Sequence, residues 1–227
     1  MISLSKYVSR WGVICLACML LAACNTRNVQ PEKPVEAVGI KSIAVLPFQD
    51  ITKIYGVNVN ARSYLSGHVM MTGYVPDSAL PYLTSTLVGL LQTSGKYTIL
   101  SSEGYQDILS GTVPNSDTTS DSLKQYVKAG KQIGADAVLV GHVFRFIDKQ
   151  GNRIAVEHPA SVAFDLSLID VATGRLIWSD RFDETQKPLS ENILDFNTFM
   201  HRKGSWITAE ELAKEGLEAI LRRFPKP

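Results

Sequence analysis

The side chains that most often perform chemistry in proteins are few and scattered in this 227-residue chain. Its four histidines are His68, His142, His158 and His201. No two of them lie four residues apart and none has a cysteine beside it, whereas a metal site needs several ligands that converge. His142 stands two residues before Phe144, a spacing typical of a histidine packed in a strand. The histidines therefore predict no metal centre.

The carboxylates offer no clearer chemistry. Asp180, Asp183 and Glu184 could supply an acid–base pair, but they lie at the end of a predicted strand, where carboxylates usually form a solvated rim. The chain contains no G-x-S-x-G, no H-E-x-x-H and no phosphate-binding glycine loop. We therefore expect no enzyme, with an unrecognised envelope hydrolase kept as the less favoured alternative.

Charge and cysteine content narrow the class of partner. The formal net charge is +1 and no basic run is present, so nucleic acid is not an expected partner. Two of the three cysteines, Cys15 and Cys18, precede the third, Cys24, within the first residues of the chain. If that leader is removed, a single cysteine is left and no disulfide can form within the chain.

The amino-terminal residues have the pattern of an export signal. Lys6 and Arg10 precede an apolar run over 11–20, and small residues follow. The run is too short to cross a bilayer as a permanent helix. The sequence over 21–24, Leu-Ala-Ala-Cys, resembles the lipobox of bacterial lipoproteins. An ordinary secretory signal with a chance cysteine is the alternative.

The lipobox resemblance implies a signal peptide over 1–23, cleavage before Cys24, and fatty acyl chains such as palmitate on that residue. Two or three acyl chains hold a protein firmly in a membrane. No cofactor other than this covalent lipid is expected. Asn25 favours the inner leaflet of the outer membrane, with the protein facing the periplasm. Residues 24–39 are polar, contain two prolines and predict a flexible acylated tether to a single domain over 40–227.

The rest of the chain predicts an α/β fold. Apolar runs and alternation predict five strands, over 41–48, 96–100, 137–146, 162–168 and 175–182. Apolar stripes and capping residues predict five helices, over 76–92, 103–109, 120–134, 189–200 and 208–223. Two strand–helix–strand crossovers make the first three strands parallel, and the D-V-A-T-G turn at 170–174 adds an antiparallel hairpin. We expect a mixed sheet with helices packed on it, in which the strand over 162–168 has one buried and one wetter face.

Three segments carry a resemblance to a family. These are K-S-I-A-V-L-P-F at 41–48, G-A-D-A-V-L-V-G-H-V at 134–143 and D-V-A-T-G-R-L-I-W at 170–178. With the lipobox, they resemble the periplasmic lipoprotein domains related to the curli-secretion lipoprotein, the penicillin-binding-protein activator lipoprotein and the amino-terminal domain of the Tol-Pal β-propeller protein. The resemblance covers about residues 40–182 and implies the fold. It transfers no functional residue, because each segment is a strand or a turn.

Two apolar clusters are candidate partner-binding sites. The long connection over 50–75 includes alternation at 55–61, typical of a hairpin arm, and the predicted contact residues Tyr64, Leu65, Met70, Met71 and Tyr74. Its alternative is a loop that folds back and covers the core. The second cluster contains Phe199 and Trp206 around the basic residues 201–203, with a packed helix as its alternative.

These features together predict a non-enzymatic envelope lipoprotein that binds a partner during envelope assembly. The expected partners are the membrane, through the acyl chains, and another envelope protein or a second copy of the chain. The alternative is an oligomeric secretion or export component, structural or pore-forming. A pore is disfavoured because the alternation over 55–61 is shorter than the 9–11 residues that a membrane strand needs.

Overall fold

The computed structural model describes residues 39–101, 119–151, 156–186 and 207–227. Cys24, Phe199 and Trp206 lie outside these residues, as do the predicted signal, tether and helices over 103–109 and 189–200. Among the described residues, no helix is both long and apolar enough to cross a membrane.

The described chain is organised on a mixed sheet whose strands have the order β10-β9-β6-β1-β5. The strands are β1 (Ser42–Val45), β5 (Thr98–Ser101), β6 (Ala137–Ile147), β9 (Ser161–Asp170) and β10 (Leu176–Thr185), with the short β2 (Gln49–Asp50) added to β6. β1 pairs in parallel with both β5 and β6, whereas β9 pairs antiparallel with β6 and β10. The predicted mixed sheet with parallel strands and an antiparallel hairpin is therefore confirmed.

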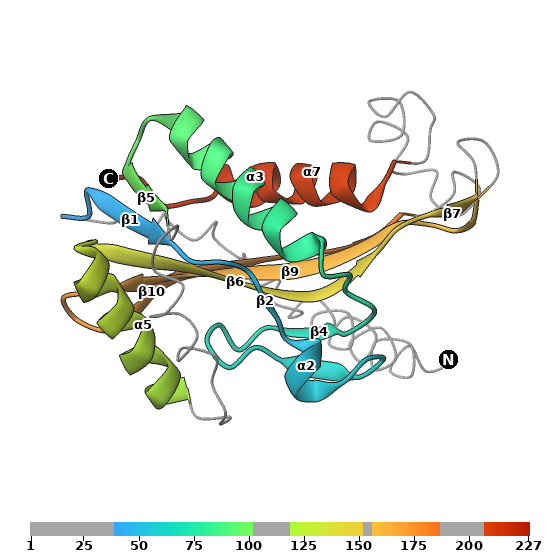
Figure 1. Ribbon diagram of the computed structural model, residues 1–227, viewed down its shortest axis with the longest axis horizontal. Helices are drawn as coiled ribbons and strands as arrows, with labels where there is room; N and C mark the ends of the chain where they lie inside the picture. Colours follow the sequence, from blue (N-terminus) through green and yellow to red (C-terminus); the bar gives the residue numbers. More distant parts are fainter. Residues whose placement is uncertain (1–38, 102–118, 152–155, 187–206) are drawn as a thin grey trace, which may run out of the picture. The chain divides into compact units, whose positions relative to one another are not determined.

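Helices α3 (Ala79–Ser94) and α7 (Ala209–Leu221) cover one face of the sheet, and α5 (Thr119–Ile133) lies on the other (Figure 1). α3 begins three residues later than predicted, because residues 76–79 form a turn in which the Ala79 N–H donates to the Pro76 carbonyl at 2.9 Å, and the Ser78 side chain makes no capping hydrogen bond. It ends at Gly95, which has the left-handed φ of 62° that favours glycine at this position.

The last helix is fixed by the capping residues that its sequence predicts. The Thr208 side chain accepts a hydrogen bond from the Glu211 N–H, and the Glu211 side chain accepts one from the Thr208 N–H at 2.9 Å. Apolar residues then recur along one side of the helix and pack on the sheet: Ala209, Leu212, Ala213, Leu217 and Ile220.

Both faces of the central strands are buried. Along β9 every residue except the last is buried, so the predicted wetter face is wrong. The polar side chains of Asp165 and Ser167 lie in the interior because α5 and the segment over 52–75 cover that face. The two apolar cores that result are separate, one on each side of the sheet.

We name residues 52–75 the arm. It contains a helical turn, α2 (Thr52–Tyr55), and a two-stranded antiparallel hairpin of β3 (Asn60–Arg62) and β4 (Val69–Met71). In Figure 1 it lies beneath the sheet, on the opposite side from α3 and α7. The alternation over 55–61 predicted a hairpin arm, and a hairpin is present, but its paired strands begin at residue 60 because residues 52–55 are helical. A second small hairpin joins β7 (Gln150–Gly151) and β8 (Val156–His158).

Candidate functional site

The arm is attached to the sheet through its backbone where it returns from β4. The Gly73 N–H donates to the Phe144 carbonyl at 2.8 Å, and the Phe146 N–H donates to the Tyr74 carbonyl at 2.9 Å. These bonds extend β6 pairing into the arm for two residues. The arm is therefore held as a continuation of the sheet rather than as a free loop.

Arg145 on β6 makes a second attachment. Its guanidinium donates to the Met71 carbonyl at 2.8 Å, to the Ser161 hydroxyl at 2.6 Å and to the Asp183 carboxylate at 2.6 Å. Only 11% of the Arg145 side chain is exposed, so the ion pair with Asp183 is shielded on the arginine side. Gly73 makes room for this side chain, since a Cβ at that position would lie 2.7 Å from the Arg145 Cγ.

Beneath the arm lies a buried polar network that joins it to the central strands. Asp165 on β9 and His142 on β6 are fully buried, and the Asp165 Oδ1 lies 3.1 Å from the His142 Nδ1. The other ring nitrogen of His142 lies 2.7 Å from the Tyr64 hydroxyl of the arm. The Ser66 hydroxyl, also from the arm, donates to the second oxygen of Asp165.

Two further side chains complete this network. The Tyr64 hydroxyl donates to the Gln49 Oε1 at 2.9 Å and lies 3.0 Å from the hydroxyl of Tyr126 on α5. The Tyr126 hydroxyl also donates to Gln49, at 3.1 Å. β2, β6, β9, α5 and the arm therefore meet at one set of hydrogen bonds.

Burial and hydrogen bonding have opposite effects on the pKa of Asp165 in this network. Burial alone would raise the Asp165 pKa, but the hydrogen bond to His142, the charge of that imidazole when protonated and the Ser66 hydroxyl outweigh it and lower the pKa. Burial raises the pKa of Tyr64 well above its usual range and that of Tyr126 to about 12. Both phenols are therefore neutral donors at physiological pH.

The order Asp165–His142–Tyr64 resembles an acid–base relay, but its terminal hydroxyl does not suit catalysis. Tyr64 is buried and its pKa is raised, so its phenolate is not formed near neutral pH, and His142 is fully enclosed. A nucleophile must be reachable and activated. The arrangement instead positions the arm, and His142 has the buried strand setting that its sequence context predicts.

The arm's burial pattern divides the predicted docking residues into two groups. Tyr64, Leu65 and Met70 are buried in the core between arm and sheet, so the prediction that they are exposed is wrong. These three residues instead follow the alternative prediction, in which the loop folds back and covers the core. Met71 and Tyr74 project outward and are 53% and 66% exposed.

Every large apolar side chain that is exposed in the described part of the chain belongs to the arm. The six are Ile54, Val57, Val59, Val69, Met71 and Tyr74. Single exposed apolar residues are ordinary on a protein surface, so their concentration in one short segment makes the arm a candidate interaction site. Ile54, Val57 and Val59 were not predicted as contact residues, although the alternation over 55–61 already contained Val57 and Val59.

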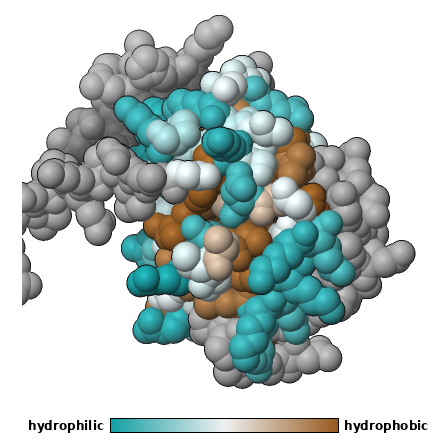
Figure 2. Space-filling view, turned by 90° about the vertical axis from the view of Figure 1, so that its left-hand side faces the viewer, coloured by the Kyte–Doolittle hydropathy of each residue, from teal (hydrophilic) through white to brown (hydrophobic). Residues whose placement is uncertain are grey.

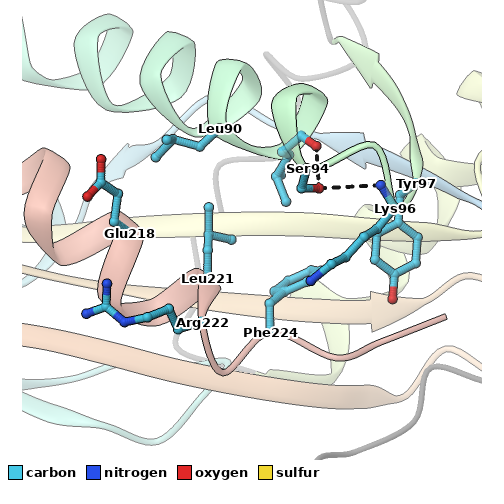
Figure 3. Close-up of a pocket in the computed structure, with 9 residues that line it drawn as sticks. Leu90, Ser94, Lys96, Tyr97, Glu218, Leu221, Arg222 and Phe224 are labelled. Carbon is cyan, nitrogen blue, oxygen red and sulfur yellow. Dashed lines mark hydrogen bonds between the residues drawn. The ribbon is translucent and has the colours of Figure 1, made fainter.

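A second surface feature lies at the end of the molecule where α3 finishes and β5 begins. Figure 2 shows this end, with apolar side chains in the middle and hydrophilic ones around them. A pocket of about 320 Å³ opens between the ends of α3 and α7, with Leu221, Tyr97 and Phe224 among its walls (Figure 3). Lys96 and Arg222 also line it. Among the described residues, no group of three or more potential metal ligands occurs.

The fold and the site define a class: an α/β domain with a mixed sheet and an arm that carries exposed apolar side chains. The family model described as peptidoglycan-synthase activator LpoB matches residues 82–183. This match confirms the family resemblance that the sequence predicted. It runs from α3 into β10 and begins after the arm.

Several solved structures are similar to the chain at low sequence identity. They include the PelC dodecamer from Paraburkholderia phytofirmans, with 14% identity over 82% of this chain and 89% of that chain and a TM-score of 0.45. The LpoB C-terminal domain from Salmonella enterica has 18% identity over 66% of this chain and 88% of that chain, with a TM-score of 0.38. Lipoprotein GNA1162 from Neisseria meningitidis has 13% identity over 71% of this chain and 91% of that chain, with a TM-score of 0.39. No curated protein sequence matches the chain.

Proposed function

We propose that this protein is a non-enzymatic envelope lipoprotein that binds and activates a peptidoglycan synthase through the exposed apolar side chains of the arm. One observation carries the proposal: the six large apolar side chains that the described residues leave exposed all lie within the arm. The match to the activator family supports the class of partner. The buried relay, which cannot reach a substrate, supports a binding role over an enzymatic one.

The arm has the mechanical properties that a docking element needs. Its backbone is bonded to β6, its carbonyls are held by arginines of the sheet, and its inner side chains are packed in the core. A surface that is rigid before binding loses less conformational entropy when the partner arrives. The backbone that carries the outward side chains is therefore held in place, while the Met71 side chain itself stays adaptable.

The proposal includes an acylated Cys24 and a flexible tether over 24–39, which would hold the domain over 40–227 at the periplasmic face of the outer membrane. Replacing Cys24 by alanine should move the protein from the membrane fraction to the soluble periplasmic fraction. Cys18→Ala is the matched control, because this cysteine lies within the predicted signal peptide and should leave the protein anchored. Full membrane retention of the Cys24 variant would overturn the anchor.

Site-specific photo-crosslinking in the protein's own cells tests the docking site. A photoreactive amino acid at Met71 should crosslink to a peptidoglycan synthase, whereas one at Lys128, which is exposed on α5, should not. Met71→Ser together with Tyr74→Ser should lower activation of that synthase. Crosslinks that form equally from both positions, or an unchanged activation by the double variant, would refute the docking role of the arm.

A further inference from the structure

The two edges of the arm hairpin differ in what they contact. The Ser63 N–H donates to the His68 carbonyl at 2.8 Å, and the Thr72 N–H donates to the Val59 carbonyl at 2.8 Å. In an antiparallel pair, hydrogen-bonded positions alternate along the strands, so Ala61 and Met70 form the pair between these two. Asn60 and Arg62 therefore direct their backbone N–H and C=O groups away from β4.

The same alternation makes Val69 and Met71 the outward positions on β4, and that edge is occupied. The Val69 carbonyl accepts from the Arg181 guanidinium at 3.3 Å, and the Met71 carbonyl accepts from Arg145 at 2.8 Å. Among the described residues β3 pairs with β4 alone. One edge of the hairpin is therefore joined to the sheet, while the edge at Asn60 and Arg62 points outward, and both of those residues are exposed.

The charge of the arm has a single sign. Residues 52–75 contain Lys53, Arg62 and His68 but neither aspartate nor glutamate. Lys53 and Arg62 are both exposed. Side chains alternate between the two faces of a strand, so Arg62 and Asn60 lie on the exposed face of β3, whereas the half-exposed Val59 lies on the face of the buried Ala61, which is turned toward the core. A strand lying beside β3 would meet a cation on one face and an apolar side chain on the other.

We infer that the outward edge of β3 binds an extended segment of the partner in which acidic and apolar residues alternate. The segment adds a strand beside β3, with backbone hydrogen bonds to Asn60 and Arg62. Its carboxylates lie on the face of Arg62 and its apolar side chains on the face of Val59. This inference rests on the proposed function, since it names the chemistry of the part of the partner that the arm recognises.

Charge selects this occupant over a second copy of the chain. Two arms placed edge to edge would bring together surfaces that both carry Lys53 and Arg62 and no acidic side chain. Like charges across a strand pair are destabilising, whereas opposite charges stabilise it. The edge is only three residues long, so the backbone bonds are few and the side-chain contacts must supply the selectivity.

Binding of two synthetic peptides to the full-length acylated protein in detergent tests the inference. One nine-residue peptide alternates valine with glutamate, and the matched peptide alternates valine with lysine. Fluorescence anisotropy should show the glutamate peptide binding about three- to tenfold more tightly, with an affinity that falls as salt is raised. Equal affinities for the two peptides would overturn the inference.

Three variants make the test specific to this edge. Arg62→Glu should invert the preference between the peptides, and Asn60→Pro should abolish binding because it removes an outward N–H that β4 does not use. Arg62→Gln loses the hydrogen bond to the Gly67 carbonyl without reversing the charge, so it separates a local structural effect from electrostatics. Lys128→Glu, on α5, should leave binding unchanged. A glutamate peptide that still binds the Asn60→Pro variant would contradict strand addition.

The outcome with the intact partner separates this inference from the proposed function. If Met71→Ser with Tyr74→Ser lowers synthase activation while Arg62→Glu and Asn60→Pro do not, the arm is the docking site and the added strand is wrong. If none of these variants changes activation, both proposals fail. Sedimentation that shows a dimer lost on Asn60→Pro, without peptide binding, would assign the edge to a second copy and overturn the acidic segment.

Discussion

Replacing Asp165 by alanine should destabilise the protein and loosen the arm. The substitution removes a fully buried carboxylate and leaves the His142 Nδ1 and the Ser66 hydroxyl without their acceptor. Leaving a buried hydrogen-bond donor unsatisfied costs about 1–3 kcal/mol, so the two donors together cost about 2–6 kcal/mol. For a protein of this size, each kcal/mol lowers the Tm by about 2–4 °C, so the expected decrease is about 4–24 °C.

Thermal and urea unfolding measure the change, and hydrogen exchange locates it. Amides of β3 and β4 should exchange faster in the variant than in the unsubstituted protein, while those of β1 and β5 should change less, because the network joins the arm to the sheet. Ser167→Ala is the matched control: it lies two residues along the same strand, is buried, and its hydroxyl has no hydrogen-bond partner among the described residues. A loss below about 1 kcal/mol for Asp165→Ala, or an equal loss in the control, would refute the assigned role of the network.

Three further predictions concern pH and the helices. The folded state lowers the pKa of Asp165, so this carboxylate stabilises the protein above the ordinary aspartate pKa of about 3.9. That stabilisation is lost as the pH falls through the lower pKa of the folded state. The Tm measured from pH 7 to pH 2 should therefore fall less steeply in Asp165→Ala than in the unsubstituted protein. Gly89→Ala should raise the free energy of unfolding by about 0.5–1 kcal/mol, because an added Cβ meets no atom within 4 Å. Gly216→Ala should lower it, because the added Cβ would lie 2.6 Å from the Phe182 ring. Urea titrations in which both variants change the free energy of unfolding in the same direction would contradict the packing. Thr208→Ala should cost about 1 kcal/mol by removing the capping box of α7, and an unchanged urea midpoint would show that the cap does not contribute.

The sequence alone determined the features that depend on neighbouring residues. Gly95 ends α3 because the residue after the helix adopts a left-handed conformation, which favours glycine. Thr208 and Glu211 begin α7 because residues three positions apart can each accept a hydrogen bond from the other's backbone N–H. Parallel and antiparallel pairing also followed from connection length, since crossovers and the tight turn after Asp170 permit few arrangements. The family resemblance rested on three short segments, of which those at 134–143 and 170–178 lie within the family match over 82–183.

Only the tertiary structure decided which residues of the arm face solvent. Tyr64 and Met71 are both apolar enough to be buried or exposed, and no local pattern distinguishes them. Tyr64 is buried because its hydroxyl meets His142, which is 78 residues away in the chain, whereas Met71 lies on the outer face of the hairpin. The second face of β9 became an interior surface for the same reason. Short-range signals specify helices and strands, but burial depends on which remote segments pack together, and that is fixed by the folded chain as a whole.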